Sequence, residues 1–314
     1  MRAISQDIFG GPEVLHLVET DRPTPLPTEV LVRVHAAGVN PVDAKTRAGQ
    51  GVACILGDPP FILGWDVSGV VEEIGHGVHT LAVGDEVYGM PWFPRAASAY
   101  AEYVTAPSRH FARKPANLSH TDAAAVPLAG LTAYQILTAL ADVEKGQRVL
   151  IHAAAGGVGH LAVQFAKELG AYVVGTASAG KHEWLRSLGA DQVIDYHSAD
   201  VAEATEDIDV AVDLVGSETT LAQSVAVTRP GGLVVAVPSG TSPELLARAA
   251  ESGVRVASYL VEPDGHALAE IAALIECGAV RAEVEEVFPL AAAAAAHRRM
   301  EDGRTRGKLV LAIR

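Results

Sequence analysis

The chain has 314 residues, of which 49% are hydrophobic and 20% charged, and this length is enough for two domains that each bury a core. The formal net charge of −14 argues against nucleic acid and anionic membrane surfaces as partners. Two cysteines, Cys54 and Cys277, are too few for a disulfide framework or a multi-cysteine metal site. The N-terminus has no signal-peptide pattern and no apolar run reaches roughly 20 residues, so a cytoplasmic protein without a membrane span is expected.

Short strands separated by glycine and proline dominate residues 1–120. A turn-rich loop covers 20–29, and expected strands cover 31–39, 68–75 and 84–90. Closely spaced short strands of this kind predict a small, strongly curved β-rich domain. One more strand is expected over 307–314. It cannot easily extend the parallel sheet described below, so we expect it to return to the β-rich domain.

A strand, a glycine-rich turn and a helix follow one another in RVLIHAAAGGVGHLAVQFAKELG, residues 148–170. Gly156 and Gly157 would let backbone N–H groups approach a pyrophosphate, and Gly159 would let the helix pack close to the strand. Ala154 stands where the usual G-x-G-x-x-G fingerprint has its first glycine, so the match is looser. A dinucleotide site is the favoured interpretation, and an ordinary strand-to-helix turn is the alternative.

Further apolar runs alternate with helical stretches after this turn. We expect strands over residues 172–178, 192–196, 208–216, 232–238 and 254–261. Near-continuous apolar strands alternating with helices predict a parallel sheet covered on both faces. The expected fold class is therefore α/β, with a Rossmann doubly wound parallel sheet beside the β-rich domain. Ligands of such sheets bind at the carboxyl ends of the strands.

The second strand of this sheet indicates which nicotinamide cofactor binds. NAD enzymes usually have a carboxylate at the end of that strand to hold the ribose 2′-hydroxyl, and this chain has none before Glu183. Ser178 could donate a hydrogen bond to a 2′-phosphate, and Lys181 could supply a positive charge. NADPH is therefore favoured over NADH. The alternative is that Ser178 is only a helix cap and Lys181 only a surface residue.

Recognisable motifs occur in order along nearly the whole sequence: GVNPVDAKTRAG, ILGWDVSGVVEEIG, VGDEVYG, YAEYV, PLAGLTAY, HAAAGGVG, LGADQVIDY, RPGGLVV and RGKLVL. On these motifs the chain as a whole resembles the medium-chain dehydrogenase/reductase superfamily. It is most similar to the zinc-independent quinone oxidoreductase branch, and within it to enone and alkenal reductases. This implies a GroES-like substrate domain formed by 1–122 with 263–314, a Rossmann domain over 123–262, and a homodimer.

The resemblance also locates the two positions at which zinc-dependent relatives bind their catalytic metal. Asn40 occupies the cysteine position and Trp65 the histidine position. An amide is a poor zinc ligand and an indole cannot coordinate zinc at all. None of the 12 histidines forms an H-x-x-x-H or H-E-x-x-H pattern. No metal is therefore expected.

Without a Lewis acid, oxidation of a simple alcohol is difficult, whereas hydride addition to an activated acceptor is easier. We therefore expect an NADPH-dependent oxidoreductase that transfers hydride to a quinone or to the activated C=C bond of an enone or enal. Asn40 and Lys45 are the catalytic candidates, as donors to the acceptor oxygen or, for Lys45, as a proton source. Their alternatives are that Asn40 holds its own loop and that Lys45 is paired with Asp43. Asp66 is expected to be a structural partner in its loop.

Other residues are assigned to the site by motif and by resemblance. The expected cofactor contacts are Thr132, Ala155, Gly156, Gly157, Val158, Gly159, Ser178, Lys181, Tyr196, Val215, Gly216 and Lys308. Trp65, Trp92, Phe93 and Leu128 are expected to line the substrate pocket, with core packing as the alternative for the rings. His152 is expected to be a packed strand residue. Two other functions stay open: a biosynthetic enoyl reductase, and a non-enzymatic NADPH-binding protein.

Overall fold

The computed structural model describes residues 1–237 and 240–314, and it divides into two compact units. Unit 1 comprises Met1–Leu131 and Val261–Arg314, and unit 2 comprises Thr132–Leu260. Pro238, the last residue of the strand expected over 232–238, lies outside the described residues.

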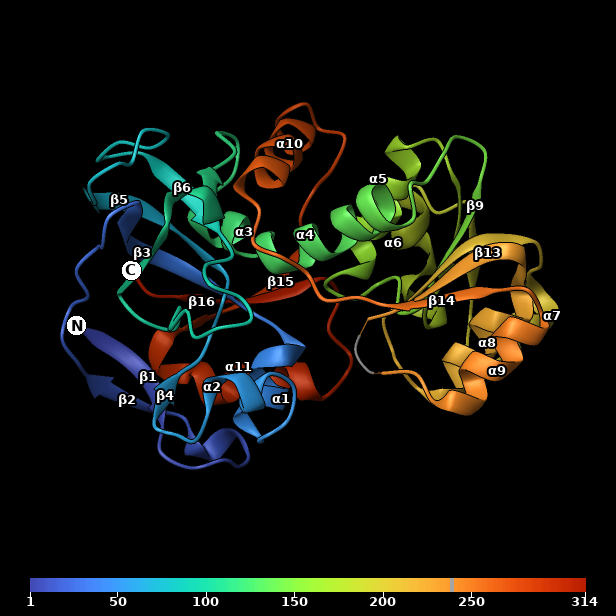
Figure 1. The fold of residues 1–314 in the computed structure, drawn as a ribbon, viewed down its shortest axis with the longest axis horizontal. Coiled ribbons are helices and arrows are strands. Elements are labelled where there is room, and N and C mark those ends of the chain that lie inside the picture. The colour runs from blue at the N-terminus through green and yellow to red at the C-terminus, as the bar shows by residue number, and fades with distance from the viewer. Residues whose placement is uncertain (238–239) are drawn as a thin grey trace. The chain divides into compact units, whose positions relative to one another are not determined.

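Unit 1 is built on β-sheets that contain segments from both ends of the chain (Figure 1). The larger sheet has the strand order β15-β16-β3-β5-β6-β8, with β7 also paired to β3, and the smaller sheet has the order β2-β1-β4. The strands are β1 (Arg2–Gln6), β2 (His16–Glu19), β3 (Glu29–Val39), β4 (Phe61–Ile62), β5 (Val67–Ile74), β6 (Glu86–Gly89), β7 (Tyr103–Pro107), β8 (Phe111–Arg113), β15 (Val284–Pro289) and β16 (Lys308–Ala312). The strands expected over 31–39, 68–75 and 84–90 are therefore present, with shifted ends.

The C-terminal strand returns to this unit, as expected from the sequence. β16 pairs antiparallel with β3, with Leu309 opposite Val39 and Ala312 opposite Ala36, so the C-terminal strand lies beside a strand from the N-terminal part of the chain (Figure 1). Apolar residues of β3, β5 and β16 form one core cluster. Alternate side chains of each strand point to the same face of the sheet, so the aliphatic residues of the three neighbouring strands meet there. This pairing places Lys308, the first residue of β16, next to the end of β3.

Short helices cover unit 1. They are α1 (Pro41–Arg47), α2 (Ala53–Leu56), α3 (His120–Ala124), α10 (Gly265–Glu276) and α11 (Ala293–Glu301), with 3₁₀ turns η1 (Pro12–Val14), η2 (Ser108–His110) and η5 (Leu290–Ala292). Helix α4 (Pro127–Gln135) crosses the boundary between the units, and the π-helical turn η3 (Ile136–Leu140) continues it. The alanine run at 291–296 falls in η5 and α11, in agreement with its high helix propensity.

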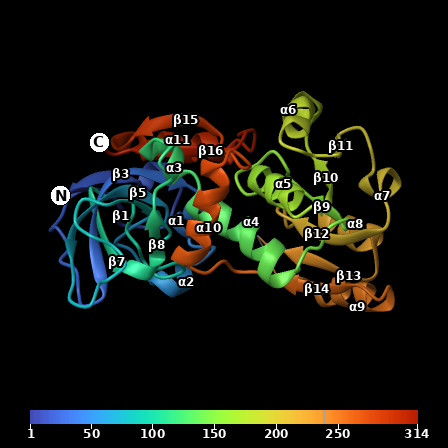
Figure 2. The same cartoon turned by 90° about the horizontal axis from the view of Figure 1, so that it is seen from above.

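Unit 2 is a parallel six-stranded sheet with the order β11-β10-β9-β12-β13-β14. Its strands are β9 (Arg148–Ile151), β10 (Tyr172–Thr176), β11 (Gln192–Ile194), β12 (Ile208–Asp213), β13 (Thr228–Ala236) and β14 (Arg255–Ser258). Its helices are α5 (Gly159–Glu168), α6 (His182–Ser187), α7 (Val201–Ala204), α8 (Glu218–Val227) and α9 (Pro243–Glu251), with the 3₁₀ turn η4 (Ala179–Lys181). Figure 2 shows α5 and α6 on one face and α8 and α9 on the other. The order and the two covered faces define a Rossmann-type sheet.

Several of these strands end earlier than the sequence suggested. The strand expected over 208–216 ends at Asp213, because its carboxylate accepts the backbone N–H groups of Val215 and Gly216 at 2.8 Å each and turns the chain away from the sheet. Likewise the strand expected over 192–196 ends at Ile194, and the Asp195 carboxylate accepts the N–H of His197. Polar turn contacts therefore set the strand ends.

Among the helices formed by the described residues, none combines the length and the apolar character needed to cross a bilayer.

Candidate functional site

The glycine-rich turn joins β9 to α5 at the carboxyl end of the parallel sheet. Backbone N–H groups of Ala153 and Ala154 bond to the hydroxyl and carbonyl of Thr176 in β10, at 3.2 and 3.0 Å. A Cβ on Gly159 would lie 2.4 Å from the carbonyl oxygen of Ala153 and 2.7 Å from the Cα of Ala154. No side chain fits at that point. The start of α5 must therefore lie directly against the turn, as the sequence predicted.

The structure also explains why alanine is tolerated at position 154. Ala154 is fully buried, and a Cβ on Gly175 of β10 would lie 2.9 Å from the Cβ of Ala154. Because Gly175 has no side chain, the neighbouring strand leaves room for the methyl group of Ala154. The glycine in β10 therefore compensates for the alanine at the first position of the fingerprint.

Other expected cofactor residues follow the carboxyl ends of neighbouring strands in unit 2. Ser178 and Lys181 follow β10, Tyr196 follows β11, and Val215 and Gly216 follow β12. Tyr196 and Val215 are 54% and 47% exposed, so both side chains are accessible. Ser178 is the N-cap residue of η4, yet its side chain makes no capping bond to any described residue. The fold brings these residues to one edge of the sheet, and their contact with a cofactor stays a prediction.

Two buried groups lie beneath this edge: Asp213, which the sequence reasoning did not single out, and His152, which it expected to be packed. Asp213 is fully buried and holds the turn at Val215 and Gly216, as described above. His152 is buried one residue beyond β9, its Nδ1 lies 3.3 Å from the Thr176 hydroxyl, and burial lowers its pKa while the nearby Asp213 charge opposes that shift. A carboxylate at the end of an apolar strand, followed by glycine, was the available signal for Asp213.

A second polar group lies inside unit 1 around Asn40. The Asn40 amide nitrogen donates to Asp66 Oδ2 at 2.8 Å, and its amide oxygen accepts from the Lys308 ammonium. Lys308 Nζ lies 3.3 Å from the same Asp66 oxygen and donates to the Val39 carbonyl at 3.1 Å. The three residues are 2%, 0% and 3% exposed. Sequence reasoning assigned Lys308 to the cofactor and missed these contacts, because Lys308 lies far along the chain from the other two.

A buried hydrogen-bond chain extends from the same loop. The Asp43 carboxylate accepts the backbone N–H of Asn40 at 2.7 Å and the Tyr100 hydroxyl at 2.9 Å. Tyr100 lies 3.2 Å from His297 Nε2, and His297 Nδ1 lies 2.9 Å from Arg47 Nη1. Since a guanidinium only donates, His297 accepts at Nδ1 and holds its own proton on Nε2, toward Tyr100.

Burial shifts the pKa values of two groups in this hydrogen-bond chain in opposite directions. It raises the pKa of the Asp43 carboxyl to about 7, against the hydrogen bonds from Asn40 and Tyr100. It lowers the pKa of His297 to about 3, and the positive charge of Arg47 adds to that shift. Tyr100, Arg47 and His297 were not identified from the sequence. A histidine within an alanine-rich helix was the available sign of a buried polar residue.

The remaining predicted residues differ in their surroundings. Trp65 is 1% exposed, donates its indole N–H to the Arg95 carbonyl at 2.7 Å and meets Phe93 edge to face. Trp92 donates its indole N–H to the Thr105 carbonyl at 2.8 Å. These contacts are those of packed core rings, the alternative considered from the sequence, and a role in lining a pocket stays a prediction for both.

Three further predicted residues lie on helices. Leu128 is buried, and its backbone N–H donates to Asp66 Oδ1 at 2.6 Å. Thr132 is buried in α4, and Lys45 is half-buried in α1. Their predicted roles beside cofactor and substrate stay predictions.

Comparison with protein families gives two matches that together cover most of the chain. Residues 26–116 match the alcohol dehydrogenase GroES-like domain, and residues 188–311 match a family described as zinc-binding dehydrogenase. The first match identifies the β-rich part of unit 1 as GroES-like, in agreement with the expectation from the sequence.

The zinc ion named in the second family does not fit the residues present. The Asn40 amide is already bonded to Lys308 and Asp66, and the Trp65 indole to a backbone carbonyl. Over residues 1–237 and 240–314, no group of three His, Cys, Asp or Glu side chains is arranged to hold a metal ion. No step of the chemistry below is therefore assigned to zinc.

Comparison with individual relatives indicates the branch of the family to which the chain belongs. The quinone oxidoreductase of Coxiella burnetii has the same fold with a TM-score of 0.94 and 41% identity, covering 100% of this chain and 99% of its own. The 2-haloacrylate reductase of a Burkholderia species is 34% identical over 96% of both chains. The NADPH-dependent alkenal/one oxidoreductase of Arabidopsis thaliana is 35% identical over 99% of this chain and 79% of its own. The chain therefore belongs to the quinone oxidoreductase branch of the medium-chain dehydrogenase/reductase superfamily.

Proposed function

We propose that the protein is a zinc-independent, NADPH-dependent reductase of quinones and of the activated C=C bonds of enones and enals. The observation that carries the proposal is the glycine turn between β9 and α5, where Gly159 excludes any side chain and the helix begins directly against the strand. The names of the relatives, which include quinone, alkenal/one and 2-haloacrylate reduction, support the acceptor class.

Different residues of unit 2 bind different parts of the cofactor. The backbone of residues 155–159 and the N-terminus of α5 bind the pyrophosphate, because the helix dipole places partial positive charge at this end of the helix. Ser178 and Lys181 bind the 2′-phosphate. Tyr196, Val215 and Gly216 contact the rest of the dinucleotide from the neighbouring strand ends. Bound NADPH supplies the hydride.

The residues of unit 1 act on the acceptor. Hydride adds to the electron-poor carbon of the C=C bond, the π electrons move to the carbonyl oxygen, and a proton from water completes the product. Asn40 donates a hydrogen bond to the oxygen that gains charge. Lys45, in α1, is a second donor to the same oxygen. Trp65, Trp92, Phe93 and Leu128 exclude water from a flat conjugated acceptor.

Turnover with a panel of acceptors tests the proposal. Purified protein should oxidise NADPH rapidly when an enone or an ortho-quinone is added, and should not do so with a simple saturated ketone. Binding of NADPH without turnover across the whole panel would instead favour the non-enzymatic reading. Strong preference for an enoyl thioester over free enones and quinones would favour the biosynthetic enoyl reductase.

Cofactor preference depends on Lys181, which follows the end of β10. Replacing Lys181 with alanine is expected to raise the KM for NADPH by about 10-fold and to leave the KM for NADH nearly unchanged, because only NADPH has a phosphate that pairs with the ammonium. Steady-state kinetics with each cofactor measure the two values. An equal rise for both cofactors would remove Lys181 from the phosphate site.

We also propose a cytoplasmic homodimer. Strand β14 forms one edge of the sheet in unit 2, where its outer N–H and C=O groups have no strand partner among the described residues, and such an edge favours pairing with a second copy. Both cysteines are free and exposed, which fits a reducing compartment. Light scattering should give twice the monomer mass, and Val256→Pro should shift it toward the monomer by removing a ladder N–H.

A further inference from the structure

The side-chain amide of Asn40 lies between two groups of opposite charge that come from distant parts of the chain. Asn40 precedes α1, Asp66 precedes β5, and Lys308 begins β16. The amide nitrogen donates to the Asp66 carboxylate and the amide oxygen accepts from the Lys308 ammonium. All three residues are at most 3% exposed, so water screens these charges little.

Opposite charges on its two sides select one orientation of this amide. An asparagine amide can occupy two positions related by a half-turn, and the two exchange its oxygen with its nitrogen. The reversed position would direct the carbonyl oxygen at the Asp66 carboxylate and the NH₂ group at the Lys308 ammonium. Both contacts would be repulsive in a buried site. The charges therefore permit only the observed orientation.

The two charged groups are themselves held in place. The second oxygen of Asp66 accepts the backbone N–H of Leu128 at 2.6 Å, and Lys308 donates to the Val39 carbonyl at 3.1 Å. The backbone N–H of Asn40 is in turn bonded to Asp43. An amide nitrogen has two hydrogens, and the contact with Asp66 uses one of them. The second N–H therefore points in a direction set by the surrounding bonds.

We propose that Lys308 and Asp66 are positioning residues that lock the Asn40 amide, so that its second N–H donates to the acceptor oxygen on which charge develops during hydride addition. This proposal rests on the proposed function. It gives Lys308 a role that acts through Asn40, in place of the direct cofactor contact expected from the sequence. A donor already held in position needs no reorganisation as the charge forms, which is how such donors lower a barrier.

A double-mutant cycle between Asn40 and Lys308 tests this proposal. Asn40→Ala is expected to lower kcat for an enone by about 100-fold, and Lys308→Met by about 10- to 100-fold, each with little change in the KM for NADPH. In the Asn40→Ala background, Lys308→Met should cost less than about 2-fold more, because the group it positions is already gone. Equal losses in both backgrounds would overturn the proposal. A raised KM for NADPH at unchanged kcat would return Lys308 to the cofactor.

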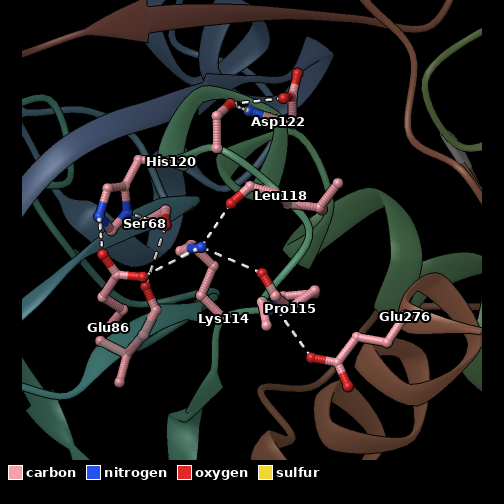
Figure 3. A network of polar contacts seen from close by, with 11 residues as sticks. Ser68, Glu86, Lys114, Pro115, Leu118, His120, Asp122 and Glu276 are labelled. Atoms are coloured by element: carbon pink, nitrogen blue, oxygen red, sulfur yellow. Dashed lines mark hydrogen bonds and ion pairs between the residues drawn. The ribbon is translucent and has the colours of Figure 1, made fainter.

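Lys114 provides a matched control in the same unit. The side chain of Lys114 is only 5% exposed, is paired with the Glu86 carboxylate at 3.2 Å and donates to the carbonyl oxygens of Pro115 and Leu118 (Figure 3). Lys114→Met should lower thermal stability to a similar extent as Lys308→Met, while its effect on kcat stays within about 2-fold. A kcat loss with Lys114→Met as large as that with Lys308→Met would show that both effects come from general destabilisation, and would overturn the proposal.

The amide orientation can also be measured without turnover. NMR of the full-length wild-type protein should show one Asn40 side-chain proton shifted downfield and protected from exchange by its bond to Asp66. Asp66→Leu/Lys308→Met, which removes both charges and the acceptor at position 66 and leaves no unpaired buried ion, should abolish this protection. An exposed, freely exchanging Asn40 amide in the wild type would overturn the lock even if the enzyme is active. Conversely, a protected amide in a protein that turns over no acceptor would leave the lock intact and refute the proposed function.

Discussion

Gly159→Ala is expected to abolish measurable NADPH binding and to destabilise unit 2 by about 3 kcal/mol or more, because the new methyl group has no space. Its Cβ would lie 2.4 to 2.8 Å from backbone atoms of Ala153 and Ala154, and backbone cannot rotate away as a flexible side chain can. Relief of the contact would separate α5 from β9 and move the turn that holds the pyrophosphate. Thermal unfolding and NADPH fluorescence titration measure the two effects.

Two other glycines in unit 2 separate these effects from a general cost of adding a methyl group. A Cβ on Gly180 would meet nothing within 4 Å, so Gly180→Ala should leave stability unchanged or slightly higher. A Cβ on Gly156 would lie 3.2 Å from the Ala153 carbonyl, so Gly156→Ala should fold while it weakens NADPH binding. If Gly159→Ala binds NADPH as tightly as Gly180→Ala does, the dinucleotide does not lie on this turn.

The free energy of unfolding is expected to fall by about 3 kcal/mol per pH unit as the pH is lowered from about 6 to about 5. Burial lowers the pKa of His110 and of His120 to about 4, and that of His297 to about 3. In the unfolded chain these groups return toward 6.5 and take up protons that the folded state excludes. Stability contributed by the neutral rings is therefore complete above pH 6.5 and is lost as the pH falls toward 4.

One buried carboxyl acts in the opposite direction. Because the pKa of Asp43 is raised to about 7, the folded state keeps a proton that the unfolded chain loses above about pH 4, so this group favours folding more as the pH falls. Between pH 5 and 6 the unfolded chain binds about three more protons than the folded state at the histidines and about one fewer at Asp43. The difference of about two protons gives the slope stated above. The lowered pKa values of His35 and His152 add to it in the same direction.

Urea unfolding at a series of pH values measures this slope and separates its sources. His297→Gln should make the slope shallower by about 1.4 kcal/mol per pH unit, because one excluded proton is gone. Asp43→Asn should make it steeper by a similar amount, because the opposing group is gone. A wild-type slope near zero between pH 5 and 6, or a slope that neither variant changes, would contradict the assignment.

Local patterns predicted the parts of the fold that depend on nearby residues. The strand, turn and helix around Gly159 could be predicted because each of their requirements lies within about 20 residues of sequence. The return of the C-terminal strand could be inferred because a further parallel strand would have needed another crossover. The strand ends were less certain. Asp213 ends β12 through two backbone hydrogen bonds that no hydrophobic pattern reveals.

The sequence by itself determined the fold class, the position of the dinucleotide turn, and the lack of zinc ligands at Asn40 and Trp65, because each depends on residue type and order. Only the tertiary structure decided what surrounds Asn40. Lys308 contacts Asn40 across a separation of 268 residues, through the pairing of β16 with β3. Sequence patterns carry no distance information over such separations. Lys308 is buried, and since a buried charge needs partners within the protein, it contacts Asp66 and Asn40, while its predicted contact with the cofactor stays a prediction.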